Sequence, residues 1–407
     1  MGTGTLRILQ LVKWLSPRED TGGKIRSCRI GGALASFAEV DAAGFVPSGE
    51  RPDGTEEHLS HYGRMYPLAA GGAKEKAGEI LSGFAAGLSL RTARFSPGRF
   101  RSFLEKILRK ERYDVLQVEE LPLMSALGPL SRALPVVYSA YNVESELSPH
   151  LFRRRNPLLR LLAEMEQGRT RREEIRALKR AGACLAVSDK DRDALRRLSP
   201  SCAPPVFVLP NCAQDRFRPS PHRPGREGIL SVGSFGWHPN ADGMSWFMDH
   251  VLPLLRREVP GAAVRIAGSG IGRPMRRRME ERGFQVHHDV PDILPFLQEA
   301  RLLVVPLRVG GGTRIKILEA WAAGLPVVAT SVGADGLSCR PGEDILIADD
   351  PAGFARAAAR LVKDDGLYEK LRSEGLKRAR DHRWSGLAAP LREAYRVVLP
   401  GKGARRP

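Results

Sequence analysis

The stretch Leu302–Pro326 reads LLVVPLRVGGGTRIKILEAWAAGLP, and it decides the fold. Its first six residues are apolar at nearly every position, which is typical of a strand buried on both faces of a parallel sheet. Three glycines follow. A helix is then expected over Thr313–Ala323, with Gly324 closing it and a new strand starting at Pro326. This order of strand, glycine-rich turn, helix and strand predicts one βαβ unit of an α/β protein.

The same alternation of short apolar runs and helical patterns covers most of the 407 residues. Strands are expected at Leu6–Val12, Asp114–Val118, Pro135–Tyr141, Ala183–Val187, Val206–Leu209, Gly228–Val232, Ala263–Ala267, Leu302–Pro306 and Pro326–Ala329. Helices are expected at Lys24–Ala38, Asn240–Val259, Asp292–Ala300, Thr313–Ala323, Ala352–Lys363 and Gly366–His382. The pattern predicts two doubly wound, Rossmann-like domains, with a ligand bound at the carboxyl ends of the strands.

A proline-rich polar segment interrupts this pattern and marks the boundary between the two domains. Pro219, Pro221 and Pro224 lie in it, which suits a linker over residues 217–227. We therefore expect an N-terminal domain at 1–216 and a C-terminal domain at 228–385. Residues 386–407 are expected to form a helix that packs back on the N-terminal domain, followed by a basic tail.

The net charge of +18 favours anionic partners, although a basic, solvated surface explains it equally well. Aromatic residues make up only 6%, and no nucleic-acid-binding module is recognisable, so nucleic acid is not an expected partner. A basic stretch over residues 153–172 also contains four leucines, at 158, 159, 161 and 162, which suits either an anionic membrane surface or a solvated helix. Five scattered cysteines and no evident signal peptide or membrane span predict a cytoplasmic protein, peripheral to the inner face of the membrane at most.

The glycine run before Thr313 has the chemistry of a diphosphate site. Glycines let the backbone approach a ligand closely, and the start of the following helix offers free N–H groups and the positive end of its dipole. Arg314 and Lys316 add positive charge there. Lys316 and Glu319 share one helix face, so they either pair with each other or line a polar cleft. Glu319 can accept hydrogen bonds from a ribose diol. The alternative is an ion-paired helix beside an ordinary glycine loop.

A second glycine pair, Gly22-Gly23, follows the first expected strand and precedes a helix. Backbone N–H groups in the first βα turn are well placed to contact a phosphate. An ordinary strand-to-helix loop is the alternative.

Asp189-Lys190-Asp191-Arg192-Asp193 contains two overlapping Asp-x-Asp patterns. A hard cation needs more oxygen ligands than this segment offers, so no metal site is expected. The segment instead predicts a helix start, with Ser188 as the N-cap and acidic residues in the first turn.

The segment Gly310–Ala320 resembles the donor-binding motif of family-4 glycosyltransferases, also described as glycosyl transferases group 1, which have the GT-B fold. Ile229–Asn240 (ILSVGSFGWHPN) resembles the start of the C-terminal domain in exopolysaccharide-type members. Further matches are Gly22–Arg26, Asn142–Ser145, Ala186–Ser188, Leu209–Asn211, Val290–Asp292 and Pro306–Arg308. The resemblance implies two Rossmann-like domains that face each other across a cleft.

The resemblance also assigns roles to residues. Arg314, Lys316 and Tyr141 are expected to be catalytic. Donor-binding positions are expected at Gly22, Gly23, His238, Gly311, Gly312, Thr313, Ile315 and Glu319, with Glu319 at the ribose. Two positions depart from the family pattern. Gly311 stands where the first Glu of the E-x7-E motif usually lies, and Tyr141 stands where the family usually has a histidine.

These residues lead to the hypothesis of a retaining, metal-independent hexosyltransferase. It would move a sugar from a UDP- or GDP-sugar to a glycan or lipid-linked acceptor, and no cofactor besides this donor is expected. Two alternatives stay open. One is a catalytically degenerate GT-B partner or binding protein, which Gly311 and Tyr141 favour. The other is a nucleotide-sugar epimerase of the same fold, for which no acid and base pair is evident.

Overall fold

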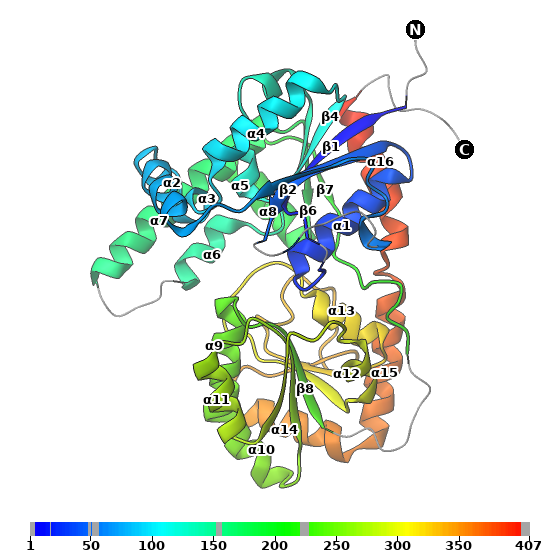
Figure 1. Ribbon diagram of the computed structural model, residues 1–407. Coiled ribbons are helices and arrows are strands. Elements are labelled where there is room, and N and C mark those ends of the chain that lie inside the picture. Colours follow the sequence, from blue (N-terminus) through cyan, green and yellow to red (C-terminus); the bar gives the residue numbers. More distant parts are fainter. Residues whose placement is uncertain are drawn as a thin grey trace. The chain divides into compact units, whose positions relative to one another are not determined.

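The computed structural model describes residues 5–16, 18–47, 50, 57–151, 157–219 and 228–399 (Figure 1). The chain divides into two compact units. Unit 1 comprises Met1–Glu19, Gly23–Pro210 and Leu387–Pro407, and unit 2 comprises Asp20–Gly22 and Asn211–Gly386. The linker predicted at 217–227 lies outside the described residues from 220 onward, and so does the basic tail.

Unit 1 is built on a parallel sheet with the strand order β3-β2-β1-β4-β5-β6-β7. Its strands are β1 (Arg7–Trp14), β2 (Glu39–Val46), β3 (Met65–Ala69), β4 (Val115–Glu119), β5 (Val136–Ser139), β6 (Ala183–Ala186) and β7 (Val206–Val208). The central strands are buried along their whole length, as in β4, because helices cover both faces of the sheet. The sequence analysis did not predict β2 or β3.

Helices connect these strands on both faces of the sheet of unit 1. They are α1 (Gly22–Ala35), α2 (Ala73–Ala85), α3 (Leu90–Ala93), α4 (Pro97–Lys110), α5 (Leu121–Met124), α6 (Glu144–Leu151), α7 (Pro157–Arg180), α8 (Asp189–Leu198) and α16 (Ala388–Val398). Figure 1 shows α6 and α7 extending to one side of this sheet. The prediction for α8 is confirmed, since the Ser188 hydroxyl accepts a hydrogen bond from the Asp191 N–H.

The helix α16 completes unit 1, although the whole of unit 2 precedes it in the chain. It packs against β5, β6 and β7. Its Tyr395 hydroxyl donates to Gln117 Oε1 at 2.9 Å, and the Gln117 amide donates to Glu119 at 3.0 Å. The same carboxylate accepts from Gln10 of β1 at 2.9 Å. A buried chain of hydrogen bonds therefore ties α16 to the two central strands.

Unit 2 is a second parallel sheet, with the strand order β10-β9-β8-β11-β12-β13. Its strands are β8 (Ile229–Ser234), β9 (Val264–Ser269), β10 (Phe284–His288), β11 (Leu302–Val305), β12 (Val327–Ala329) and β13 (Leu346–Ile347). Its helices are α9 (His238–Trp246), α10 (Leu252–Glu258), α11 (Arg273–Glu281), α12 (Leu294–Glu299), α13 (Ile315–Ala322), α14 (Pro351–Lys363) and α15 (Asp365–Arg380). The predicted α/β class with two doubly wound sheets is confirmed.

Three predicted helix boundaries need correction. The helix expected over Asn240–Val259 begins earlier, at His238, because Pro239 suits a first turn, and a π-helical turn at Phe247–Val251 separates α9 from α10. The helix expected from Thr313 begins later, at Ile315, because Arg314 has extended backbone angles. Gly22 and Gly23 are the first residues of α1, so they form a helix start and not a loop.

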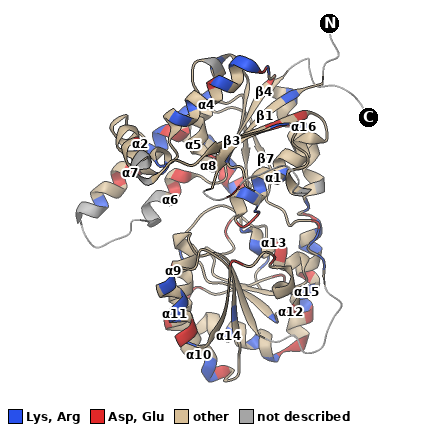
Figure 2. Ribbon diagram, viewed as in Figure 1, with Lys and Arg blue, Asp and Glu red and all other residues tan. Residues whose placement is uncertain are grey.

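The charged residues are distributed over both units. In Figure 2, Lys and Arg positions are marked on helices of each unit, with acidic positions interspersed. None of the helices among the described residues is long and apolar enough to cross a membrane.

A close approach between α9 and the end of β11 gives the first testable prediction. A Cβ atom on Gly243 would lie 2.4 Å from the Pro306 carbonyl oxygen, which is a backbone atom and cannot rotate away. We expect Gly243→Ala to lower the free energy of unfolding by about 2 kcal/mol, the usual cost of overpacking. Chemical denaturation monitored by circular dichroism measures this change.

Gly78→Ala is the matched control, since it also lies inside a helix but meets no atom within 4 Å. Glycine in a helix interior costs up to about 1 kcal/mol relative to alanine, so this control should be neutral or stabilising. Equal effects of the two substitutions would contradict the packing argument.

Candidate active site

The glycine run lies between β11 and α13, at the carboxyl end of the sheet of unit 2. Gly310 and Gly312 have φ angles of 132° and 71°, which residues other than glycine rarely adopt. Arg314 is the N-cap of α13 and forms no side-chain cap hydrogen bond. The Arg314 side chain therefore does not cap the first turn of α13, and a helix start of this kind attracts anions through its N–H groups and its dipole.

The Lys316 amine ties three elements of unit 2 together. It donates to the Val232 carbonyl of β8 at 2.6 Å and to Asn240 Oδ1 of α9 at 3.0 Å. Gly233 makes room for it, because a Cβ atom there would lie 2.7 Å from Lys316 Nζ. The hydrogen-bond partners of the amine thus come from β8 and α9 and not from Glu319, with which the sequence left a pairing open.

The environment of Lys316 disfavours its charge. Burial and, to a smaller extent, the Arg314 charge lower the pKa of the amine from 10.5 to about 7, although the Glu319 carboxylate opposes both effects. A lysine with this pKa changes its charge near neutral pH. An incoming anion would stabilise the protonated form.

The Arg314 side chain is buried and folds over the glycine run. Its Nη1 donates to the Gly311 carbonyl, and its guanidinium lies 5.7 Å from the ring centre of Trp237. The neighbouring Thr313 hydroxyl accepts from the Asn211 amide at 2.7 Å. These contacts fix the loop from both sides.

The remaining predicted residues of unit 2 occupy the same end of the sheet. Glu319 is buried on the second turn of α13, and Ile315 is the first residue of that helix. His238 is exposed and is the first residue of α9, directly after Trp237. The sequence analysis assigned no role to Gly233 or Asn240, although both lie in the quoted segment Ile229–Asn240. Their role depends on Lys316, which is far from them in sequence.

Of the predicted site residues, Gly23 and Tyr141 belong to unit 1, and they lie at the carboxyl end of its sheet. A Cβ atom on Gly23 would lie 3.7 Å from Tyr141 Cε2, so the α1 start and the end of β5 are adjacent. Burial, followed by the Glu119 charge, holds the pKa of the Tyr141 hydroxyl well above 10. Tyr141 therefore stays protonated and serves as a hydrogen-bond donor, not as a base.

Arg26 and Glu119 accompany Tyr141, and the sequence analysis gave neither a role. The Arg26 guanidinium lies 5.3 Å from the centre of the Tyr141 ring and donates to the Leu209 carbonyl at 2.8 Å. Burial raises the pKa of the Glu119 carboxyl, and hydrogen bonding from Gln10 opposes that effect. A buried arginine and a buried glutamate thus lie beside the tyrosine that stands where the resemblance expects a histidine.

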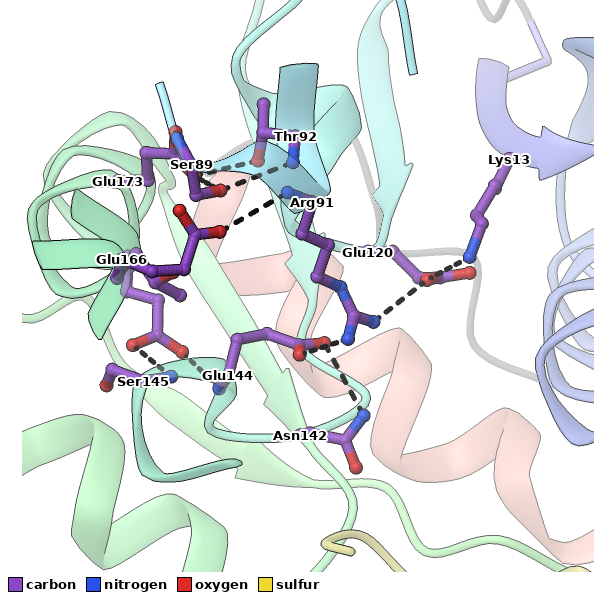
Figure 3. Close-up of polar contacts among 12 residues, drawn as sticks. Lys13, Ser89, Arg91, Thr92, Glu120, Asn142, Glu144, Ser145, Glu166 and Glu173 are labelled. Carbon is purple, nitrogen blue, oxygen red and sulfur yellow. Dashed lines mark hydrogen bonds and ion pairs between the residues drawn. The ribbon is translucent and has the colours of Figure 1, made fainter. Parts of the chain in front are cut away.

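A network of charged side chains lies next to these residues (Figure 3). Glu120 Oε2 lies 3.2 Å from Lys13 Nζ and 3.9 Å from Arg91 Nη2. Arg91 Nη1 lies 2.8 Å from Glu144 Oε2, and burial raises the pKa of the Glu144 carboxyl. Sequence patterns gave no sign of this network beyond Asn142–Ser145, because its members come from four separate elements.

The two parallel sheets and the sites at their carboxyl ends define a protein of the GT-B fold class. Residues 226–364 match the family model described as Glycosyl transferases group 1.

Sequence relatives and solved structures are similar to this chain as well. A D-inositol 3-phosphate glycosyltransferase of Salinispora arenicola is 26% identical over 364 residues, covering 80% of this chain and 78% of its own length. An uncharacterized 44.6 kDa protein in the cps region of Klebsiella pneumoniae is 26% identical over 150 residues. That alignment covers 35% of this chain and only 39% of the Klebsiella protein, so the chain spans about two fifths of that relative.

Two solved structures share the fold over nearly the whole chain. The sucrose-phosphate synthase of Thermosynechococcus elongatus has a TM-score of 0.72 at 17% identity, covering 96% of this chain and 98% of its own. Anabaena HepE, in complex with UDP and glucose, has a TM-score of 0.68 at 12% identity, covering 96% and 99%.

The lowered pKa of Lys316 predicts how stability varies with pH. Between about pH 7 and about pH 10 the unfolded chain keeps the lysine proton and the folded chain has lost it, so this residue makes stability rise with pH. We expect the unfolding free energy of the native protein, minus that of Lys316→Met, to increase across this window. Urea unfolding at a series of pH values measures it. Parallel pH profiles for the two proteins would contradict the assignment.

Proposed function

We propose that this protein is a retaining glycosyltransferase that moves a sugar from a UDP- or GDP-sugar to a glycan or lipid-linked acceptor. The observation that carries the proposal is the cation pair Arg314 and Lys316 at the uncapped start of α13, behind a glycine run. The match of residues 226–364 to glycosyl transferases group 1 supports the same reaction class.

The donor site is proposed at the carboxyl end of the sheet of unit 2. The N–H groups of the first turn of α13 and the Arg314 guanidinium bind the diphosphate. Lys316 uses two of its three donors on Val232 and Asn240, and its third donates to a phosphate oxygen. Glu319 accepts from the ribose hydroxyls. Anabaena HepE, which has this fold, was solved with UDP and glucose.

In the proposed reaction, negative charge develops on the diphosphate as its bond to the sugar breaks. Fixed cations and helix N–H groups stabilise that charge without having to reorganise. A lysine with a pKa near 7 becomes fully protonated as the charge builds up, which strengthens its attraction to the leaving group. Tyr141 and Gly23, at the carboxyl end of the sheet of unit 1, stay proposed as site residues of the same reaction.

Two residues depart from the family pattern, and they leave two alternative functions open. Gly311 offers no carboxylate to the donor sugar, and Tyr141 offers a hydroxyl in place of an imidazole. A catalytically degenerate binding protein would bind the nucleotide without transfer. An epimerase would convert one nucleotide sugar into another.

The ribose assignment of Glu319 is tested with paired ligands. We expect Glu319→Gln to weaken UDP or GDP binding about tenfold, because a hydrogen bond to a charged group contributes about 1.5–3 kcal/mol. The loss should be smaller for the 2′-deoxynucleotide, which lacks one hydroxyl of the diol. Isothermal titration calorimetry measures all four affinities, and equal losses for the two ligands would refute the ribose contact.

Arg276→Met serves as a control for general charge effects, since Arg276 lies on α11 of the same unit and pairs with Glu280 at an exposed site. It should leave nucleotide affinity unchanged. Failure of the native protein to bind any nucleotide sugar in a panel would overturn the donor site. Binding without transfer to any acceptor extract would favour the degenerate partner, and appearance of an epimeric donor would favour the epimerase.

A membrane surface is the proposed location of a lipid-linked acceptor. On α7, Leu161, Leu162 and Met165 are 54%, 47% and 46% exposed, and they lie on one helix face. The neighbouring Arg160 side chain is 79% exposed. Apolar side chains beside basic ones suit insertion at an anionic lipid interface.

Vesicle binding tests this location. We expect sedimentation with phosphatidylglycerol vesicles, little with phosphatidylcholine vesicles, and a severalfold loss of bound protein in the double variant Leu161→Ser, Leu162→Ser. Val397→Ser removes a similarly exposed apolar side chain from α16 and should bind like the native protein. Equal binding to both lipids, or no effect of the α7 variant, would contradict the proposal.

A further inference from the structure

The two central strands of unit 1 end at a point where a ligand is expected. In the order β3-β2-β1-β4-β5, the chain continues from β1 to β2 in one direction along the sheet. From β4 it continues to β5 in the opposite direction. Such a reversal leaves a crevice at the carboxyl ends of the two strands, and open α/β sheets bind ligands there. Lys13 lies near the end of β1, and Glu120 follows β4 directly.

Both strand ends depart from regular backbone geometry. The pairing of β1 with β2 shifts register between Val12 and Trp14, which leaves Lys13 as the extra residue of a bulge. Glu120 has φ and ψ angles of 70° and 149°, a combination that is essentially restricted to glycine. These independent irregularities bring two side chains together, since Lys13 Nζ and Glu120 Oε2 are 3.2 Å apart.

Arg91 of α3 extends this pair into a network that is charge-balanced. It lies between Glu120 and Glu144, so two cationic and two anionic side chains alternate (Figure 3). The two carboxylates are nearly buried, whereas the Lys13 and Arg91 side chains are 21% and 36% exposed. Part of each cationic side chain therefore reaches solvent, and the Glu120 carboxylate lies between the two cations.

Three glutamates of α7 hold the backbone that carries this network. Glu173 accepts from the Ser89 N–H at 2.6 Å, and Glu166 accepts from the Leu90 N–H at 3.0 Å, which fixes the start of α3. Glu174 accepts from the Glu144 N–H at 2.5 Å. Arg91 and Glu144 are thus positioned by buried hydrogen bonds and do not depend on each other for their location.

We propose that Lys13, Glu120 and Arg91 form a saccharide subsite that binds adjacent hydroxyl groups of an uncharged acceptor sugar. This inference rests on the proposed glycosyl transfer and adds the chemical class of the acceptor. A diol both donates and accepts hydrogen bonds, so it matches a carboxylate that lies between an ammonium and a guanidinium. An acidic or phosphorylated sugar would meet the Glu120 and Glu144 carboxylates, which already balance both cations.

The experiment is saturation-transfer NMR on the full chain with its donor site occupied by UDP or GDP, whichever binds. The probes are methyl glycosides of neutral hexoses, methyl glucuronide and glucose 1-phosphate. We expect the neutral glycosides to bind in preference to the two anionic probes. Glu120→Gln should weaken their binding at least tenfold and leave nucleotide affinity unchanged.

Glu111→Gln is the matched control, because Glu111 also pairs with cations, Arg7 and Arg64, but near the amino ends of strands β1 and β4. It should bind neutral glycosides like the native protein. Should Glu120→Gln not fold, Lys13→Met removes the neighbouring donor and should give the same selective loss.

The outcomes separate this inference from the proposed function. Nucleotide binding with no preference for neutral glycosides, or with the same preference in Glu120→Gln as in the native protein, would overturn the subsite alone. Loss of nucleotide binding by the native protein would instead overturn the donor site on which the inference rests.

Discussion

The buried ammonium of Lys316 is the constraint around which unit 2 is organised. A charged amine can be removed from water only if protein atoms replace its hydration, and here a β8 carbonyl and an α9 amide do so. The glycine at position 233 is then required, because a side chain there would occupy the space of the amine. The ends of β8, α9 and α13 are therefore fixed together, and the glycine run is held beside them.

In unit 1, buried carboxylates hold separate elements together in a similar way. The α7 residues Glu166, Glu173 and Glu174 are all buried, and each accepts hydrogen bonds from backbone N–H groups at the start of another helix. Burial raises the pKa of Glu174 to about 7, and the hydrogen bonds oppose this change. A buried carboxylate is costly in itself, but it satisfies several donors at once and fixes the loops that carry charged side chains.

The sequence predicted what depends on local pattern. The Ser188 N-cap, the βαβ unit around Leu302–Pro326 and the parallel class of both sheets were all readable from residue order. Contacts between segments that are distant in sequence could not be predicted in this way. The partners of Lys316 lie 84 and 76 residues away, and those of Glu173 lie more than 80 residues away. The left-handed backbone at Glu120 has no local signal either, because the sequence shows a glutamate where glycine would be expected. The α1 start was misplaced because two glycines normally indicate a loop.

The position of α16 has a consequence for how the chain acquires its structure during synthesis. Unit 1 uses residues from both before and after unit 2, and its Tyr395 hydroxyl closes the hydrogen-bond chain that runs through Gln117 to Glu119. A ribosome therefore completes all of unit 2 before α16 is available to cover β5, β6 and β7. Until then the nascent first unit exposes apolar strand surface, while the second can already fold. The unit that begins first is the one that finishes last.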